Sequence, residues 1–195
     1  MTLSSLPSHP LESAELEQYS TEGEFAAVWL SKIFEAGDLT SETEVMDLGA
    51  GNGILGIGAA LLGAKLCHLV EIDSEALEAA HQAVESLDLQ GVCELIQSDV
   101  RDLEPRPVCL VITNPPWGFQ TERADRPFLD YAFANATDAI HILHSAKATH
   151  IEAMAAESGW KGEIIHQGKF RLPAVYEHHT SRKRETAVNC WRFTR

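Results

Sequence analysis

The stretch Asp47-Leu48-Gly49-Ala50-Gly51-Asn52-Gly53 decides the fold of this chain. It follows a short apolar segment, residues 43–48, and precedes an apolar segment with helical spacing, residues 54–62. Glycines let a backbone turn tightly and approach a ligand closely. The pattern predicts a strand, a glycine loop and a helix, with a ligand held at the turn. The residues leave one alternative open, a tight strand-to-helix turn that binds nothing.

The acid at the start of this loop narrows the chemistry of the ligand. The spacing of the glycines, GxGxG, differs from the GxGxxG fingerprint of dinucleotide-binding folds. Asp47 would repel a pyrophosphate, whereas it could accept a hydrogen bond from an amino group. We therefore expect a cationic or zwitterionic ligand, with Asp47 acting on its amino end.

Strand-like and helix-like segments alternate on both sides of the loop. This alternation predicts a parallel sheet with right-handed crossovers. The last two strand-like segments have no helix between them, so they should return antiparallel. The expected strands are residues 43–48, 66–72, 92–96, 108–113, 139–144, 162–172 and 186–194. The expected helices are residues 54–62, 74–87, 128–136 and 146–157.

Length and composition fit one globular domain. The chain has 195 residues, of which 45% are hydrophobic and 23% charged. Residues 1–12 are rich in Ser and Pro and are expected to form a loosely ordered tail. No apolar run approaches the ~18 residues that span a bilayer, and the N-terminus lacks the features of a secretory signal. We expect a cytoplasmic protein without a membrane segment.

Cysteine usage points to the same compartment. Cys67, Cys93, Cys109 and Cys190 lie far apart, and no CxxC pair occurs. This spacing suggests neither a zinc knuckle nor a redox pair. The four residues are expected to be reduced, mostly buried thiols.

Charge is distributed unevenly along the chain. The net charge is -14 overall. From residue 161 to the end, however, there are eight basic and three acidic residues, against seven basic and 26 acidic residues in the rest. This asymmetry suggests a basic contact face on an acidic body. The alternative is a solvated charged hairpin, and charge alone does not decide between them.

Acidic residues end the second and third expected strands. Glu71 stands at a strand tip, where a carboxylate can take both ribose hydroxyls of a nucleoside. Asp73 precedes the next helix, so its ordinary role is that of an N-cap. Ile72 would lie against an adenine face. Asp99 could accept a hydrogen bond from the adenine amino group, and the Val100 backbone would contact the ring. Asp99 could otherwise be a simple turn or cap residue.

Asn114-Pro115-Pro116-Trp117 ends the fourth expected strand. Two prolines hold the backbone extended. The Asn114 amide oxygen and the Pro115 carbonyl would then be two fixed acceptors for one planar NH2 group, and Trp117 would stack on its ring. Such a clamp pulls the nitrogen towards a tetrahedral geometry and exposes its lone pair. The alternative is a proline-rich turn with no catalytic role.

Taken together, DLGAGNG, VEID, SDV and NPPW resemble a class I S-adenosylmethionine-dependent methyltransferase. LEQYST upstream (residues 16–21), HILHS (141–145) and RLPAVY (171–176) are similar to the archaeal and eukaryotic methyltransferase-like enzymes that make N6-methyladenosine in small-subunit ribosomal RNA. The resemblance covers residues 11–193. It implies a Rossmann-like fold with a seven-stranded, mostly parallel sheet, one antiparallel strand from a C-terminal hairpin, and helices on both faces.

The resemblance also implies a set of site residues. Glu71 stands where the family usually has Asp, and Trp117 where Phe is usual. Thr21 with Glu24 also fits a capping box, which is the structural alternative for that position. The implied cofactor contacts are Gln18, Thr21, Asp47, Gly49, Gly51, Asn52, Ile54, Glu71, Ile72, Asp99 and Val100. The implied catalytic residues are Asn114, Pro115, Pro116 and Trp117. The expected RNA-binding residues are Lys169, Arg171, Arg182, Lys183 and Arg184.

The activity implied is transfer of a methyl group from S-adenosyl-L-methionine to adenosine N6 in small-subunit ribosomal RNA. A small zinc-containing activator subunit is implied as a partner, and residues 92–96 form the expected edge strand that it could extend. The alternative activities are methylation of a glutamine amide or of another nucleobase amine, such as DNA adenine or guanine N2. The non-enzymatic alternative is a binding scaffold. No metal site is expected, because His141 and His144 should point to opposite faces of a strand.

Overall fold

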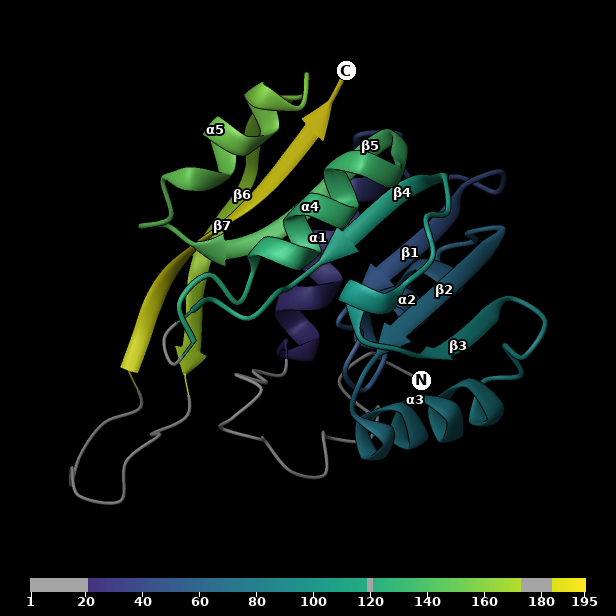
Figure 1. Cartoon of the computed structure of the whole chain (residues 1–195). Coiled ribbons are helices and arrows are strands. Elements are labelled where there is room, and N and C mark those ends of the chain that lie inside the picture. The colour runs from purple at the N-terminus through teal and green to yellow at the C-terminus, as the bar shows by residue number, and fades with distance from the viewer. Residues whose placement is uncertain (1–20, 119–120, 173–183) are drawn as a thin grey trace.

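The residues that the structure describes form a seven-stranded sheet with helices on both faces (Figure 1). The structure is a computed structural model, and it describes residues 21–118, 121–172 and 184–195. The strands are β1 (Glu44–Leu48), β2 (Leu66–Glu71), β3 (Cys93–Gln97), β4 (Val108–Thr113), β5 (Ala136–Ser145), β6 (Lys161–Leu172) and β7 (Arg184–Thr194). The helices are α1 (Gly23–Glu35), α2 (Ile54–Leu61), α3 (Ser74–Ser86), η3 (Val100–Asp102), α4 (Arg126–Asn135) and α5 (His150–Glu157).

The strand order is β3-β2-β1-β4-β5-β7-β6. β7 runs antiparallel to both of its neighbours, and the other strands share one direction. This confirms the predicted Rossmann-like α/β fold and its antiparallel strand. Among the described helices, none is long and apolar enough to cross a bilayer.

Helix α1 was not among the predicted elements. Its buried residues Ala26, Trp29, Leu30 and Ile33 follow helical spacing, which is the signal that could have found it. The N-cap is Glu22, and no side chain caps the helix there. The alternative capping role of Thr21 is therefore wrong. Other boundaries move by a few residues; α5, for example, begins at His150 rather than at residue 146.

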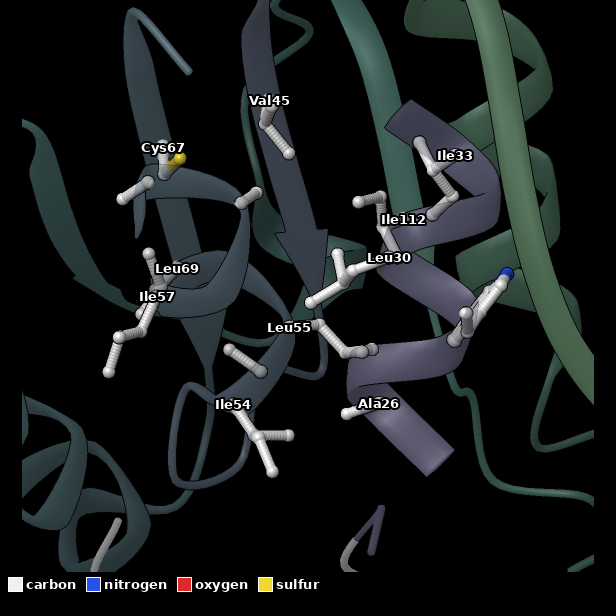
Figure 2. Packing of buried hydrophobic residues seen from close by; sticks show 14 of the residues in the cluster. Ala26, Leu30, Ile33, Val45, Ile54, Leu55, Ile57, Cys67, Leu69 and Ile112 are labelled. Atoms are coloured by element: carbon white, nitrogen blue, oxygen red, sulfur yellow. The ribbon is translucent and has the colours of Figure 1, made fainter. Parts of the chain in front are cut away.

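The sheet separates two apolar cores. Side chains along each strand alternate between them: Val45 faces the helices α1, α2 and α3, whereas Met46 faces η3, α4 and α5. Figure 2 shows Leu30 and Ile33 of α1 and Ile54, Leu55 and Ile57 of α2 beside the strands that they cover. The four cysteines are free, and three of them are buried, as predicted.

The carboxyl ends of the parallel strands meet at one edge of the sheet. β1 and β4 are neighbours there, although they are separated in the sequence by β2 and β3. The Thr113 hydroxyl ties the two strand ends by donating to the Leu48 carbonyl at 2.8 Å. In open α/β sheets, ligands bind in the crevice at such a change of strand order.

A partly buried ion network ties the segment after α1 to strands β5, β7 and β6. Asp38 Oδ2 lies 2.7 Å from Nε2 of His141 in β5, and 2.7 Å from Nε of Arg192 in β7. Arg192 also reaches Glu163 in β6, with 2.8 Å between Nη1 and Oε1. Burial alone would raise the pKa of Asp38, but Arg192 and His141 outweigh it and lower the pKa to about 2. The carboxylate therefore stays ionised across the physiological range.

We expect Asp38→Ala to lower the free energy of unfolding by at least about 2 kcal/mol, because it removes the carboxylate that faces His141 and Arg192. Glu35→Ala is the matched control, since Glu35 pairs with Lys32 on the surface of α1. Its cost should stay below about 1 kcal/mol. Urea denaturation at pH 7 measures both, and equal costs would contradict a stabilising role for the network.

Candidate active site

A cavity of about 440 Å³ lies at the carboxyl edge of the sheet. This volume is in the range of small-molecule sites in proteins. The predicted site residues that line it are Thr21, Gly49, Gly51, Asn52, Ile54, Glu71, Ile72, Asp99, Val100, Asn114 and Pro116. Asp47, Pro115 and Trp117 are not part of its lining, and Gln18 lies outside the described residues.

The glycine loop depends on its glycines. Gly53, the N-cap of α2, has φ of 81°, and a Cβ there would lie 2.8 Å from a Leu69 methyl. The loop is held to β2, since the backbone N–H groups of Gly49 and Ala50 both donate to the Val70 carbonyl at 2.9 Å. A larger residue at position 53 would therefore be strained and would also collide with the core.

Glu71 joins the glycine loop to the end of β2. Its Oε2 accepts from the Gly51 backbone N–H at 2.8 Å. Its Oε1 accepts from the Ile72 and Asp73 N–H groups at 2.8 and 2.9 Å. The Asp73 side chain caps α3 by accepting from the Glu75 and Ala76 N–H groups, which confirms its expected N-cap role. The Ile72 side chain is 46% exposed and lines the cavity, so an apolar surface borders the acid.

Asp47 does not line the cavity. It is buried, and its Oδ2 accepts from the Gly56 N–H in α2 at 2.8 Å. The expected direct contact with the amino end of a ligand is therefore not supported by the structure. Burial raises the pKa of Asp47 to about 7; the Gly56 hydrogen bond lowers it, and the nearby Glu71 carboxylate raises it further. Asp47 supports the loop from behind.

Asp99 lines the cavity, and its carboxylate is already paired with Arg101. It is the N-cap of η3, accepting from the Arg101 backbone N–H at 2.9 Å, and it pairs with the Arg101 guanidinium. The cap role that the sequence left open is therefore confirmed. The guanidinium hydrogen bonds are the main reason that the pKa of Asp99 is lowered. A ligand amino group would have to share this carboxylate with Arg101.

The Asn114 amide is held from two sides. Its Nδ2 donates to Thr21 Oγ1 at 3.2 Å, and its Oδ1 accepts from the Trp117 indole N–H at 3.2 Å. The second bond needs an indole, because a phenyl ring has no donor. Thr21, from the segment before α1, thus reaches the end of β4 and helps to orient the acceptor.

Trp117 is buried, which corrects the expectation that it offers a free face for stacking. The residue is 8% exposed. Its ring lies against His144, with 5.8 Å between centroids, and against Phe170 of β6, at 5.5 Å. Trp117 acts in this structure as a support for Asn114.

Sequence reasoning missed the far wall of the cavity. Thr121, Arg123 and Phe128 line it, and Arg101 lies near Asp99. A Cβ at Gly49 would meet the Phe128 ring at 3.0 Å, so this ring closes tightly over the loop. Their position in the sequence could have indicated them, because Thr121 and Arg123 lie in the connection from β4 to α4 and Phe128 lies in the first turn of α4.

The expected RNA-binding residues are described in part. Lys169 is exposed and lies 3.1 Å from Glu185, measured from Nζ to Oε2. Arg171 and Arg184 lie at the facing ends of β6 and β7, whereas Arg182 and Lys183 are outside the described residues. The two histidines of β5 point to opposite faces, as predicted: His141 contacts Asp38, and His144 contacts Asp125.

The sequence and the fold of this chain are both similar to those of known methyltransferases. The model of the methyltransferase small domain family matches residues 24–142. This chain belongs to that family. Its structure superposes with a TM-score of 0.87 on a Pyrococcus horikoshii protein described as a candidate RNA methyltransferase, at 34% identity, covering 98% of this chain and 93% of the other.

Two relatives align with this methyltransferase over almost its whole length. An uncharacterised protein of Methanocaldococcus jannaschii is 36% identical over 205 residues, covering 99% of this chain and 91% of its own length. The rRNA N6-adenosine-methyltransferase METTL5 of Danio rerio is 35% identical over 184 residues, covering 92% and 88%.

The cofactor of this methyltransferase is S-adenosyl-L-methionine. The residues present fit it on three observations. Glu71 places a carboxylate at the end of β2, Ile72 offers an exposed apolar side chain beside it, and the glycine loop leaves no room for side chains at Gly49 and Gly53. When bound, the cofactor supplies an electrophilic methyl group.

We expect Asp47→Asn to stabilise the protein more at high pH than at low pH. The folded-state pKa of Asp47, about 7, lies above its ordinary value of 3.8. The wild-type protein therefore loses stability as pH rises through this window, by up to about 1.4 kcal/mol per pH unit. The amide of the variant keeps an acceptor for the Gly56 N–H and carries no charge.

Urea denaturation of both proteins between pH 4 and pH 8 measures this effect. The advantage of the variant should grow up to about pH 7 and then level off. A difference in stability that is independent of pH would show that Asp47 is ionised throughout.

Proposed function

We propose that this methyltransferase transfers a methyl group to N6 of an adenosine in small-subunit ribosomal RNA. The observation that carries the proposal is the position of Asn114. It lines the same cavity as Glu71 and is oriented by Thr21 and Trp117. An amide held in this way suits a planar amine. The relative from Danio rerio, which acts on rRNA adenosine N6, supports the choice of base.

In this proposal the cofactor lies across the carboxyl edge. Glu71 takes the ribose hydroxyls, while Ile72 and Val100 flank the adenine. Asp99 accepts from the adenine amino group, in competition with Arg101. The glycine loop, including Asn52 and Ile54, and Thr21 would enclose the methionine end. Gln18, which the family resemblance adds, lies outside the described residues. Glu71 is one methylene longer than Asp, and its role at the strand tip is unchanged.

The acceptor loop prepares the nucleophile. Exocyclic amines of bases are weak nucleophiles because the nitrogen lone pair is delocalised into the ring. Two acceptors, Asn114 Oδ1 and the Pro115 carbonyl, hold the two hydrogens and turn the lone pair towards the methyl group. Pro116 keeps the loop extended, and proximity supplies much of the rate. The amine proton leaves after transfer, when the nitrogen is strongly acidic.

The RNA reaches this site along the C-terminal hairpin. β6 runs parallel to β5, so its carboxyl end lies at the same edge as Asn114, and Phe170 of β6 contacts Trp117. Lys169 and Arg171 lie near this end of β6, and Arg184 begins β7. Arg182 and Lys183, which complete the expected basic set, lie outside the described residues. The acidic body repels phosphates elsewhere, so the basic hairpin steers the backbone. The target adenosine is unpaired or flipped, because N6 is shielded in a duplex.

The test is methylation of ribosomal RNA by the purified protein with labelled cofactor, followed by digestion to nucleosides. We expect the label in N6-methyladenosine of the small-subunit RNA. Asn114→Ala should lower kcat at least 100-fold, since losing one positioned acceptor costs about 3–4 kcal/mol in the transition state. The dissociation constant of the cofactor should stay within a few-fold of wild type, because Glu71 is untouched.

Each alternative gives a different result. Label in protein would favour a glutamine-amide methyltransferase. Label in another methylated nucleoside would show that the target is a different base. Cofactor binding without turnover on any substrate would favour a scaffold. A wild-type rate for Asn114→Ala would refute the clamp.

We further propose a cytoplasmic enzyme that pairs with a small zinc-containing activator subunit at β3. This strand is an edge of the sheet, as predicted. Glu94, its charged residue, is held on the sheet face by His68 and Arg106, at 2.6 Å and 3.2 Å. Its charge therefore discourages strand pairing less than that of a free side chain.

The free edge of β3 can be altered without breaking its backbone hydrogen bonds to β2. The Cys67 N–H donates to the Val92 carbonyl, and the Ser98 N–H donates to the Glu71 carbonyl. In a parallel ladder the backbone groups of successive residues point alternately towards and away from the neighbouring strand. Val92 and Ser98 bond to β2, so the N–H and carbonyl of Leu95 point away from β2. Leu95→Pro removes an outward N–H, whereas Leu95→Ala loses the same side-chain packing and keeps that N–H.

We expect Leu95→Pro to abolish co-purification with a co-expressed small zinc-containing activator subunit, and Leu95→Ala to retain it. Size-exclusion chromatography of the co-expressed proteins measures this. A complex that forms equally with both variants, or a wild-type protein that is fully active alone, would contradict the proposal.

A further inference from the structure

We propose that Asp125, His144 and His150 form a binding site for a divalent transition-metal ion of the Zn²⁺ class. The three residues come from different elements: Asp125 precedes α4, His144 lies near the end of β5, and His150 begins α5. One ligand atom from each lies within 4.8 Å of the others. No metal site was expected from the sequence, because His141 and His144 point to opposite faces of β5 and the other two residues of this cluster lie in separate elements.

The carboxylate of Asp125 faces the two imidazoles. Asp125 occupies the N-cap position of α4, yet its side chain accepts no hydrogen bond from the helix. Its Oδ2 lies 2.6 Å from Nε2 of His150 and 3.2 Å from Nε2 of His144. A side chain suited to capping is thus turned towards a common point between two histidines.

The buried imidazole of His144 is a second, independent reason to expect a metal ion at this cluster. The residue is 2% exposed, and among the described residues neither of its ring nitrogens has a hydrogen-bond partner of acceptable geometry. Its Nε2 is near Asp125 but poorly aligned for a hydrogen bond. Buried polar groups are almost always satisfied. A metal ion at the common point would satisfy Nε2 at the distance that the structure shows.

The spacing suits a tetrahedral ion after a small movement. With metal–ligand bonds of about 2.0–2.2 Å, neighbouring ligand atoms lie roughly 3.4 Å apart. The pair at 3.2 Å already fits, and the pair at 2.6 Å must open by roughly 0.8 Å. The third pair, formed by the two imidazoles, lies within 4.8 Å. His150 can make this movement, because its side chain is 44% exposed. Two imidazoles and one carboxylate favour Zn²⁺ and related ions over Mg²⁺ or Ca²⁺.

A fourth coordination position would face solvent. A second cavity, of about 430 Å³, is lined by Trp117, Gly118, Arg123, Asp125, Arg126 and His150. Three protein ligands with one open position is the arrangement of sites that keep water or another exchangeable ligand. The two arginines favour an anionic fourth ligand. Since His144 stacks against Trp117, which holds Asn114, the ion would stiffen the support of the acceptor loop.

Metal titration of tag-free protein, stripped with chelator, tests the proposal. We expect one Zn²⁺ per chain in competition with a chromophoric chelator, and Co²⁺ should give the visible d–d bands of a four-coordinate site. His150→Ala and Asp125→Ala should weaken Zn²⁺ binding at least tenfold. Zn²⁺ should raise the Tm of the wild-type protein and not that of His150→Ala.

His81→Ala is the matched control. His81 is similarly exposed and lies 3.8 Å from the Glu85 carboxylate, so it represents an ordinary surface pair. This variant should bind Zn²⁺ like wild type, and circular dichroism confirms that each variant is folded. Absence of saturable Zn²⁺ binding, or equal loss in His81→Ala and His150→Ala, would overturn the proposal and leave a hydrogen-bonded cluster.

Discussion

The carboxylate of Glu71 is the interaction on which the cofactor site depends. It accepts backbone hydrogen bonds from the glycine loop after β1 and from the turn after β2, at 2.8–2.9 Å. A carboxylate can accept several N–H groups, so one side chain fixes two loops from adjacent strands. Both loops border the cavity. The shape of the site therefore follows from one acid at the tip of a parallel strand.

Much of this arrangement could be predicted from the sequence. Parallel strands bring their carboxyl ends to one edge, so the glycine loop, Glu71, Asp99 and Asn114 were expected to meet, and they line one cavity. The antiparallel return of the last strands also followed, because no helix separates them. These predictions rest on backbone topology, which hydrophobic periodicity encodes well.

Predictions failed where side-chain direction or a partner from a distant element decides. Asp47 turns towards Gly56 at the start of α2 instead of the ligand. Trp117 packs against His144 and Phe170. The meeting of Asp125 with His144 and His150 depends on where β5, α4 and α5 pack, which strand and helix patterns do not specify. Such contacts become visible only in three dimensions.

Calorimetric titration of Glu71→Gln with S-adenosyl-L-methionine tests the central claim most directly. The substitution keeps the size of the side chain and removes its charge, and its amide NH2 cannot accept from the backbone. Hydrogen bonds to charged groups contribute about 1.5–3 kcal/mol each, so the dissociation constant should rise at least tenfold while the fold is retained. A dissociation constant within twofold of wild type would contradict the account.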